Sequence, residues 1–299
     1  MSNSTIAVLG LGAMGLPMAT RLAEKFAVRS FDIASSRMEL AKEAGVAPTG
    51  SAREAATGAD IVLLAVRNRA QLDAALFGDD GVTDVLKPGA TIVLTSTVGI
   101  EAVREVAVQL DALGLHIVDA PVSGGPVRAG NGDLLIVVGA TDDAYAAAVE
   151  VLEQLASTLV RIGANPGDGQ AMKTVNQLLC GVHIAAGAEA LALAEALGID
   201  PAVALETLGA GAAASFMLAD RGPRMLQAYD EGGAEVRSRI DIFTKDMGIV
   251  NSAARAVGIA TPIAAAAENL YVIAEAAGNG AKDDSSVITV MAPTRKGTV

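Results

Sequence analysis

Residues 5–15 read TIAVLGLGAMG, an apolar run that leads directly into three glycines. A helical pattern follows from Leu16 to about Lys25, so the segment predicts a strand, a glycine turn and a helix in that order. In a dinucleotide-binding unit the first glycine, Gly10, allows the tight turn, and the second, Gly12, lets the backbone approach the pyrophosphate. The third, Gly15, lets the helix pack on the strand, and the helix N-terminus holds the phosphate charge.

A second short strand, residues 27–31, ends in Asp32, about twenty residues past the glycines. An acid at this place accepts hydrogen bonds from an adenosine ribose. A glycine turn that serves only packing is the alternative, and the agreement of loop, strand order and acid disfavours it. Asp32 would repel a 2′-phosphate, so the sequence predicts NAD over NADP, and Arg37 weakens that preference without reversing it.

Strands and helices alternate over the first 160 or so residues. Near-continuous apolar strands are typical of a parallel sheet that is covered on both faces. The expected strands after the first two are residues 60–66, 91–95, 115–119, 134–139 and 158–162, separated by helices at about 35–44, 69–76, 101–113 and 142–155. We therefore expect an α/β domain over residues 1–163, with the doubly wound parallel sheet of a Rossmann fold.

The pattern changes at residues 163–169, which are a linker by composition. Beyond it the sequence predicts an all-α domain, residues 164–299, that opens with a helix over residues 170–197. At 1.5 Å per residue this helix would span about 42 Å, so it either forms the spine of its domain or buries a face against another subunit. Shorter helices are expected at 201–208, 216–227, 240–257 and 262–277.

Composition excludes several classes of protein. The net charge of −12 argues against nucleic-acid partners and against binding to an anionic membrane surface. With one cysteine, Cys180, no intrachain disulfide can form, and a reducing cytoplasm is expected. The two histidines, His116 and His183, have no metal-ligand spacing, so no metal is expected. No signal peptide and no run of about eighteen apolar residues are recognised, which disfavours secretion and membrane spanning.

Three polar features remain to be explained. Lys173 lies on the long helix and shares a face with Asn176, Gln177 and Cys180. That face is otherwise mostly apolar, although a lone helical lysine most often sends its ammonium to water. Residues 119–132 are expected to leave a buried strand as a glycine-rich loop around Ser123. Successive backbone N–H groups there would bind a carboxylate, unless the loop is only a wide turn.

The third feature is the pair Lys245 and Asp246, which interrupts a predicted helix. Adjacent helical residues do not face each other, so we do not expect a self-contained ion pair, and a surface charge is the simplest interpretation.

Together these stretches resemble the β-hydroxyacid dehydrogenase family, which is related to 3-hydroxyisobutyrate and 6-phosphogluconate dehydrogenases. Four signatures occur in the family's order: GLGAMG at 10–15, DAPVSGG at 119–125, Gly169 with Lys173 and Asn176, and Lys245 with Asp246. Residues 178–190, 240–246 and 282–288 are most similar to family members that act on L-threonate. Gln177 departs from the pattern, because many relatives have a second asparagine there.

The resemblance implies an NAD-dependent oxidoreductase that transfers hydride reversibly between nicotinamide and a small hydroxy acid, with L-threonate as the expected type of substrate. Lys173 would be the general acid and base, and a second cation, Lys245, would lower its pKa. Substrate binding falls to Ser123, Gly124, Gly125 and Asn176. Cofactor binding falls to Gly10, Gly12, Ala13, Met14, Gly15, Asp32, Ala65, Val66, Thr97 and Lys245. The resemblance also implies a homodimer or homotetramer.

Alternatives stay open at this point. A 3-hydroxyisobutyrate dehydrogenase or a tartronate semialdehyde reductase would use the same residues. An imine reductase has a similar frame but usually lacks the lysine. A protein that binds NAD(H) without catalysis is the most distant alternative.

Overall fold

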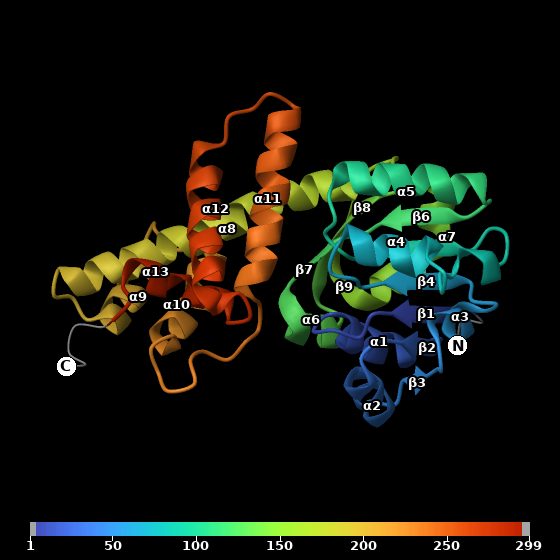
Figure 1. Cartoon of the computed structure of the whole chain (residues 1–299), viewed down its shortest axis with the longest axis horizontal. Helices are drawn as coiled ribbons and strands as arrows, with labels where there is room; N and C mark the ends of the chain where they lie inside the picture. The colour runs from blue at the N-terminus through green and yellow to red at the C-terminus, as the bar shows by residue number, and fades with distance from the viewer. Residues whose placement is uncertain (1–3, 295–299) are drawn as a thin grey trace. The chain divides into compact units, whose positions relative to one another are not determined.

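The computed structural model describes residues 4–294 and forms two compact units, one through Lys173 and one from Thr174 onward. The first is an α/β unit and the second is helical, as the ribbon in Figure 1 shows. The fold class predicted from the sequence is therefore confirmed. The division at residue 163 stays a prediction about functional domains.

The first unit contains one sheet. Its strands are β1 (Thr5–Leu9), β2 (Ala27–Phe31), β3 (Ala47–Pro48), β4 (Ile61–Leu64), β5 (Thr91–Leu94), β6 (His116–Asp119), β7 (Val122–Ser123), β8 (Leu134–Gly139) and β9 (Ala156–Gly163). The order is β3-β2-β1-β4-β5-β6-β8-β7, and β9 pairs with β8. Strand order reverses between β1 and β4, and open α/β sheets bind ligands at the carboxyl ends of such a pair.

The six neighbouring strands β3, β2, β1, β4, β5 and β6 are all parallel, as predicted. At the other edge β8 runs antiparallel to β6 and β7, and β9 runs parallel to β8, so the sheet as a whole is mixed. Apolar periodicity does not report strand direction, which is why the sequence did not predict this edge.

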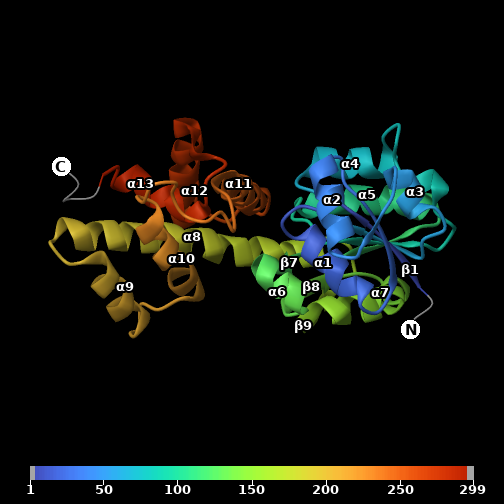
Figure 2. The ribbon, with the colours of Figure 1, turned by 90° about the horizontal axis from the view of Figure 1, so that it is seen from below.

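Helices cover both faces of the sheet. They are α1 (Gly15–Ala23), α2 (Ser35–Glu43), α3 (Ala52–Ala56), α4 (Arg69–Phe77), α5 (Ile100–Ala112), α6 (Gly125–Asn131) and α7 (Asp142–Leu155). Alternate residues of β1, β4 and β5 enter two separate cores. Ile6 and Val8 pack with α1, α6 and α7, whereas Ala7 and Leu9 pack with α3, α4 and α5. Figure 2 shows these two helical layers on opposite sides of the strands.

The second unit is built along α8 (Asp168–Ala196), whose first turns belong to the first unit. Its other helices are α9 (Pro201–Gly209), α10 (Phe216–Gln227), α11 (Ile240–Ala256), α12 (Pro262–Ala274) and α13 (Ile288–Met291), with a π-helical turn at Glu275–Asn279 and a 3₁₀ turn at Asp284–Val287. Ile184, Met225, Met247 and Tyr271 are among the buried side chains of its core. The short elements β3, α3 and α13 were not predicted, because they are too short to show a period.

The chain end of this unit is held by a buried carboxylate. Asp283 accepts hydrogen bonds from the backbone N–H of Arg237 at 2.9 Å, from Arg224 Nε at 3.1 Å and from Ser285 Oγ at 2.5 Å. The pKa of Asp283 is lowered because these donors and the Arg224 charge outweigh its burial. The neighbouring Asp284 pairs with Arg221 at 3.0 Å, so two ion pairs join the 3₁₀ turn to α10.

Among the described residues, α8 is the helix that is long and apolar enough on average to cross a membrane, and half of its most apolar window is buried in the protein. The sequence did not predict this property of α8, because polar residues such as Asn176 and Glu189 interrupt its apolar run. A core helix of a soluble protein meets the same criterion.

Candidate active site

The glycine loop between β1 and α1 combines two closely packed glycines with one that has open space beside it. Gly10 has φ +93°, and a Cβ on it would lie 2.5 Å from the carbonyl oxygen of Ala65. A Cβ on Gly15 would overlap the carbonyl oxygen of Gly10, so the first and third glycines permit close backbone packing. A Cβ on Gly12 would have no atom within 4 Å. The space beside Gly12 is therefore open, which fits the approach of a pyrophosphate.

Asp32 and Arg37 flank this loop and are both fixed to it. The Leu11 N–H donates to Asp32 Oδ2 at 2.6 Å, and the Ala34 N–H donates to Oδ1 at 2.8 Å. Arg37 donates from Nε to the Leu11 carbonyl at 2.6 Å and from Nη2 to the Gly12 carbonyl at 3.0 Å. Sequence reasoning placed Arg37 near the ribose but did not anticipate these contacts, which give the loop a positive charge next to the acid.

Two of the predicted strand-end residues lie beside the loop. The Ala65 N–H donates to the Leu9 carbonyl at 2.9 Å, which continues the pairing of β1 with β4. The Val66 N–H donates to Ser96 Oγ at 2.8 Å, so the buried Ser96 joins the ends of β4 and β5. Thr97 follows directly and is half-buried. Ser96 was not singled out from the sequence, because a serine after a strand carries no signal of its own.

The Ser123 stretch is not the loop that the sequence predicted. Val122–Ser123 forms β7, which pairs with β8, and Gly125–Asn131 forms α6 with Pro126 in its first turn. Gly124 and Gly125 have φ +142° and +81°, so they make the turn between the strand and the helix. The many glycines concealed a helix, because Pro126 favours the first helical turn and Gly132 ends the helix in a left-handed conformation.

A buried carboxylate holds the start of α8. Asp119 Oδ2 accepts hydrogen bonds from the N–H groups of Gly167 at 3.0 Å and Gln170 at 2.8 Å. Gln170 Nε2 donates to Asp119 Oδ1 at 2.8 Å, and Gln170 Oε1 accepts from the N–H groups of Val98 and Gly99. Burial raises the pKa of Asp119 to about 6 despite these donors. Neither Asp119 nor Gln170 was a predicted site residue.

Lys173 follows Gln170 by three residues, one helical turn further along α8. Its exposed fraction is 8%, so it is not the solvated surface lysine that the simplest interpretation of a helical lysine predicts. The hydrogen bonds of Asp119 and Gln170 fix the backbone turn that precedes it.

In the second unit, Asn176 and Lys245 are connected through two residues. Lys245 Nζ lies 2.7 Å from Asp246 Oδ1, and Gln177 Nε2 donates to Asp246 Oδ2 at 2.6 Å. Asn176 Nδ2 donates to Gln177 Oε1 at 2.9 Å and to Cys180 Sγ at 3.4 Å. The expectation that Lys245 and Asp246 do not pair is wrong, because the long lysine side chain reaches its neighbour.

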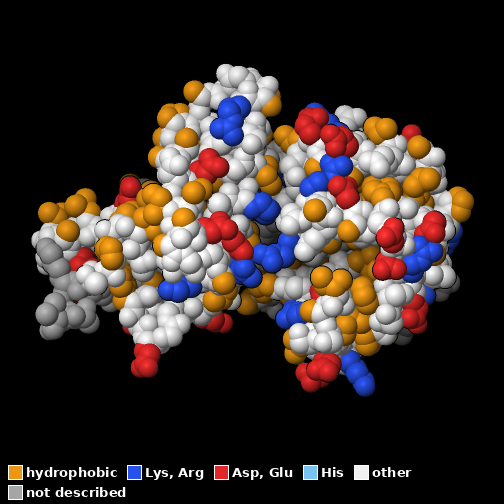
Figure 3. Space-filling model, viewed as in Figure 1, with side chains coloured by type: hydrophobic (Ala, Val, Ile, Leu, Met, Phe, Trp, Pro, Cys, Tyr) orange, Lys and Arg blue, Asp and Glu red, His pale blue; other side chains and the backbone are white. Residues whose placement is uncertain are grey.

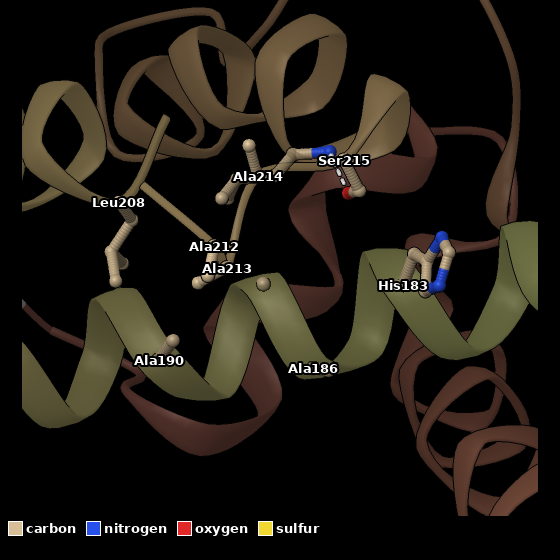
Figure 4. Close-up of a pocket in the computed structure, with 10 residues that line it drawn as sticks. His183, Ala186, Ala190, Leu208, Ala212, Ala213, Ala214 and Ser215 are labelled. Atoms are coloured by element: carbon tan, nitrogen blue, oxygen red, sulfur yellow. Dashed lines mark hydrogen bonds between the residues drawn. The ribbon is translucent and has the colours of Figure 1, made fainter. Parts of the chain in front are cut away.

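A separate hollow of about 420 Å³ lies between α8 and the segment that joins α9 to α10 (Figure 4). Half of its lining residues are alanines, and His183, Leu208 and Ser215 are among the others. Ser215 Oγ accepts from the Leu218 N–H at 3.0 Å and so caps α10. None of the predicted site residues lines this hollow.

Family models match both parts of the chain. The NAD binding domain of 6-phosphogluconate dehydrogenase matches residues 5–163, and the NAD-binding domain of NADP-dependent 3-hydroxyisobutyrate dehydrogenase matches residues 167–291. The chain belongs to the β-hydroxyacid dehydrogenase family. It is therefore an oxidoreductase with the nicotinamide-binding domains of that family, as the four signatures predicted.

Named relatives cover nearly the whole chain. L-threonate dehydrogenase of Escherichia coli K12 is 38% identical over 97% of this chain and 95% of its own. 3-Hydroxyisobutyrate dehydrogenase of Pseudomonas aeruginosa is 34% identical over 89% and 90%. A crystal structure titled 3-hydroxyisobutyrate dehydrogenase, from Salmonella typhimurium, superposes with a TM-score of 0.89 at 36% identity, covering 96% of this chain and 100% of that one.

Proposed function

We propose that the chain oxidises a small hydroxy carboxylic acid reversibly, with Lys173 as general acid and base. The observation that carries this proposal is the burial of Lys173 on the turn that Asp119 and Gln170 fix. In oxidation, the substrate carbon loses a hydride and its hydroxyl proton passes to Lys173 Nζ. The bound nicotinamide supplies the hydride acceptor. In the reverse direction the Lys173 ammonium returns the proton and stabilises the developing alkoxide.

The remaining predicted site residues take supporting roles in this proposal. Ser123, Gly124 and Gly125 orient the substrate carboxylate, and Asn176 holds the substrate from α8. Gly10, Gly12, Ala13, Met14 and Gly15 receive the pyrophosphate. Asp32, Ala65, Val66, Thr97 and Lys245 contact the rest of the cofactor. The open space at Gly12 supports the assignment of the phosphate cradle.

The proposed cofactor is NAD. Asp32 accepts from two backbone N–H groups of its own region, so its carboxylate is held beside the loop where a ribose would lie. A carboxylate at that place repels a 2′-phosphate. The Arg37 guanidinium is directed to the carbonyls of Leu11 and Gly12, which reduces its availability for a phosphate.

The proposed substrate is L-threonate or a similar acid. The supporting observation is that the L-threonate dehydrogenases of E. coli K12 and Cupriavidus necator are 38% and 37% identical to this chain over 97% and 96% of its length. The alternatives are 3-hydroxyisobutyrate and tartronate semialdehyde. They are supported by the relatives named 3-hydroxyisobutyrate dehydrogenase and 2-hydroxy-3-oxopropionate reductase.

Two measurements test the catalytic role. The first is turnover of L-threonate, 3-hydroxyisobutyrate, glycerate and tartronate semialdehyde with NAD(H) and NADP(H). The second is the variant Lys173→Ala, with Lys42→Ala as a control because Lys42 is an exposed lysine on α2. We expect Lys173→Ala to bind NADH normally and to lose at least about a hundredfold in kcat. Near-normal turnover by Lys173→Ala would refute the role.

We also propose that the protein is a cytoplasmic homodimer or homotetramer. Apolar side chains on and just after α8 are exposed in the single chain, with Leu193 on the helix 60% and Leu197 beyond its end 69% exposed. Others are Val175 and Leu179 on α8 and Ile263 on α12, and Figure 3 shows apolar side chains gathered over α12. Small-angle scattering at micromolar protein concentration tests this proposal, and a monomeric mass would contradict it.

A further inference from the structure

The hydrogen bonds that end at Asn176 begin at a carboxylate. Asp246 is 3% exposed and forms an ion pair with Lys245, and the oxygens of a carboxylate in an ion pair act as hydrogen-bond acceptors. The Gln177 amide must therefore present Nε2 to Asp246, at 2.6 Å. Its oxygen, Oε1, then faces Asn176 and can only accept. The two hydrogen bonds of the Gln177 amide thus fix its orientation.

The same reasoning fixes Asn176. Its Nδ2 group has two N–H donors. One is directed to Gln177 Oε1 at 2.9 Å and the other to Cys180 Sγ at 3.4 Å, so neither remains for a substrate. Within residues 4–294 the oxygen of the same amide, Oδ1, forms no hydrogen bond with another side chain or the backbone. Asn176 therefore offers a ligand an acceptor and no donor.

We propose that Gln177 and Asp246 are positioning residues, which hold Asn176 as the acceptor for a second hydroxyl of the substrate. The inference rests on the proposed function. A substrate carboxylate has no proton to donate. The reacting hydroxyl has a single proton, and Lys173 takes it. Among the groups of a hydroxy acid, only a second hydroxyl then remains to donate to Asn176 Oδ1, so the site selects acids that carry two or more hydroxyl groups.

The test compares acids that differ by one hydroxyl. Glycerate carries hydroxyls on C2 and C3. Lactate lacks the hydroxyl on C3, and 3-hydroxypropanoate lacks the hydroxyl on C2. We expect kcat/KM of the wild-type protein for glycerate to exceed that for either single-hydroxyl acid by about 3- to 10-fold, which is the fold-change that the net contribution of one hydrogen bond produces. Lactate is the reference if C2 is oxidised, and 3-hydroxypropanoate is the reference if C3 is oxidised.

Two substitutions at Gln177 separate positioning from a structural role. In Gln177→Met nothing holds the Asn176 amide, so the ratio of kcat/KM for glycerate to kcat/KM for each single-hydroxyl acid should fall to about twofold or less, whatever the absolute activity of the variant. In Gln177→Glu the introduced carboxyl still accepts from Asn176 Nδ2, so the preference should survive. If Gln177 has only a structural role, Gln177→Glu should lose more of the preference than Gln177→Met, because it places a second acid against the buried Asp246. Gln109→Met, at an exposed glutamine on α5, is the control.

The outcomes are distinguishable. If no hydroxy acid is turned over with either cofactor, the proposed function fails. If acids are turned over but one hydroxyl serves as well as two, or if Gln177→Met keeps the full preference, the positioning role is overturned while the proposed function stands. Thermal unfolding of each variant establishes that the protein under assay is folded.

Discussion

The buried carboxylate of Asp119 makes the stability of the first unit depend on pH in a direction opposite to that of most acids. Its pKa is about 6 in the folded protein and 3.8 in the unfolded chain, so the folded state binds the proton more tightly. The resulting contribution is fully present below pH 3.8 and is lost as the pH rises through about 6. The shift corresponds to about 3 kcal/mol in all, at 1.36 kcal/mol per unit.

Only part of this range is accessible, because the protein is near its isoelectric point of about 4.6 in acid. Between about pH 5 and pH 8 the lost contribution is about 1.4 kcal/mol. The variant Asp119→Asn removes the titration. It also places an amide N–H against Gln170 Nε2, which cannot turn away, because Gln170 Oε1 accepts from Val98 and Gly99. This mismatch costs about 1–3 kcal/mol, independently of pH.

The assay is urea unfolding followed by circular dichroism, since the chain has no tryptophan. We expect the free energy of unfolding of the wild type, minus that of Asp119→Asn, to fall by about 1.4 kcal/mol from pH 5 to pH 8. The control is Asp60→Asn. The hydrogen bond from Lys87 and the Thr5 N–H lower the pKa of Asp60, so its difference should be flat in this range. A flat or rising difference for Asp119→Asn would refute the reasoning.

Three further predictions concern the glycine loop, Asp32 and Asp283. The free energy of unfolding of Gly12→Val should lie within about 0.5 kcal/mol of the wild-type value, but the variant should no longer bind NADH in a fluorescence titration. Gly15→Ala should instead lower the melting temperature, because its Cβ overlaps the Gly10 carbonyl oxygen. Equal effects of the two on stability would contradict this. Asp32→Ser should reduce the NAD-to-NADP ratio of kcat/KM by about tenfold or more, because the carboxylate that repels a 2′-phosphate is removed; an unchanged ratio would remove Asp32 from cofactor selection. Asp283→Asn should cost about 1–3 kcal/mol in urea unfolding, since it removes one of the two carboxylates that pair with the buried Arg224 and sets an amide N–H against one of the donors around residue 283; Glu235→Gln, in an exposed pair, is the control and should cost less than about 0.5 kcal/mol.

Much of the fold was predictable because its signals are local. The glycines at 10, 12 and 15 are adjacent in sequence, and the apolar strands and the helix at α8 extend over enough residues to show their periods. The α6 helix was missed because its glycines resemble a loop, although Pro126 and Gly132 are proper start and stop residues.

The supporting contacts of the site were not predictable in the same way. Asp119 and Gln170 are 51 residues apart, and Gln177 and Asp246 are 69 residues apart. No periodicity connects such positions, since their contact depends on how whole elements pack. Gln177 was noticed only as a departure from a family pattern, and its role in orienting Asn176 emerged from the direction of its hydrogen bonds.

The Asp283 carboxylate has a consequence for how far the chain can be shortened. Its donors come from α10, from the backbone at residues 237 and 238, and from Ser285. Trimming the chain from its C-terminal side past residue 283 would leave Arg224 buried with no counter-charge from that side. A shortened chain that keeps these contacts therefore extends at least through Ser285, even though every predicted site residue lies before residue 246.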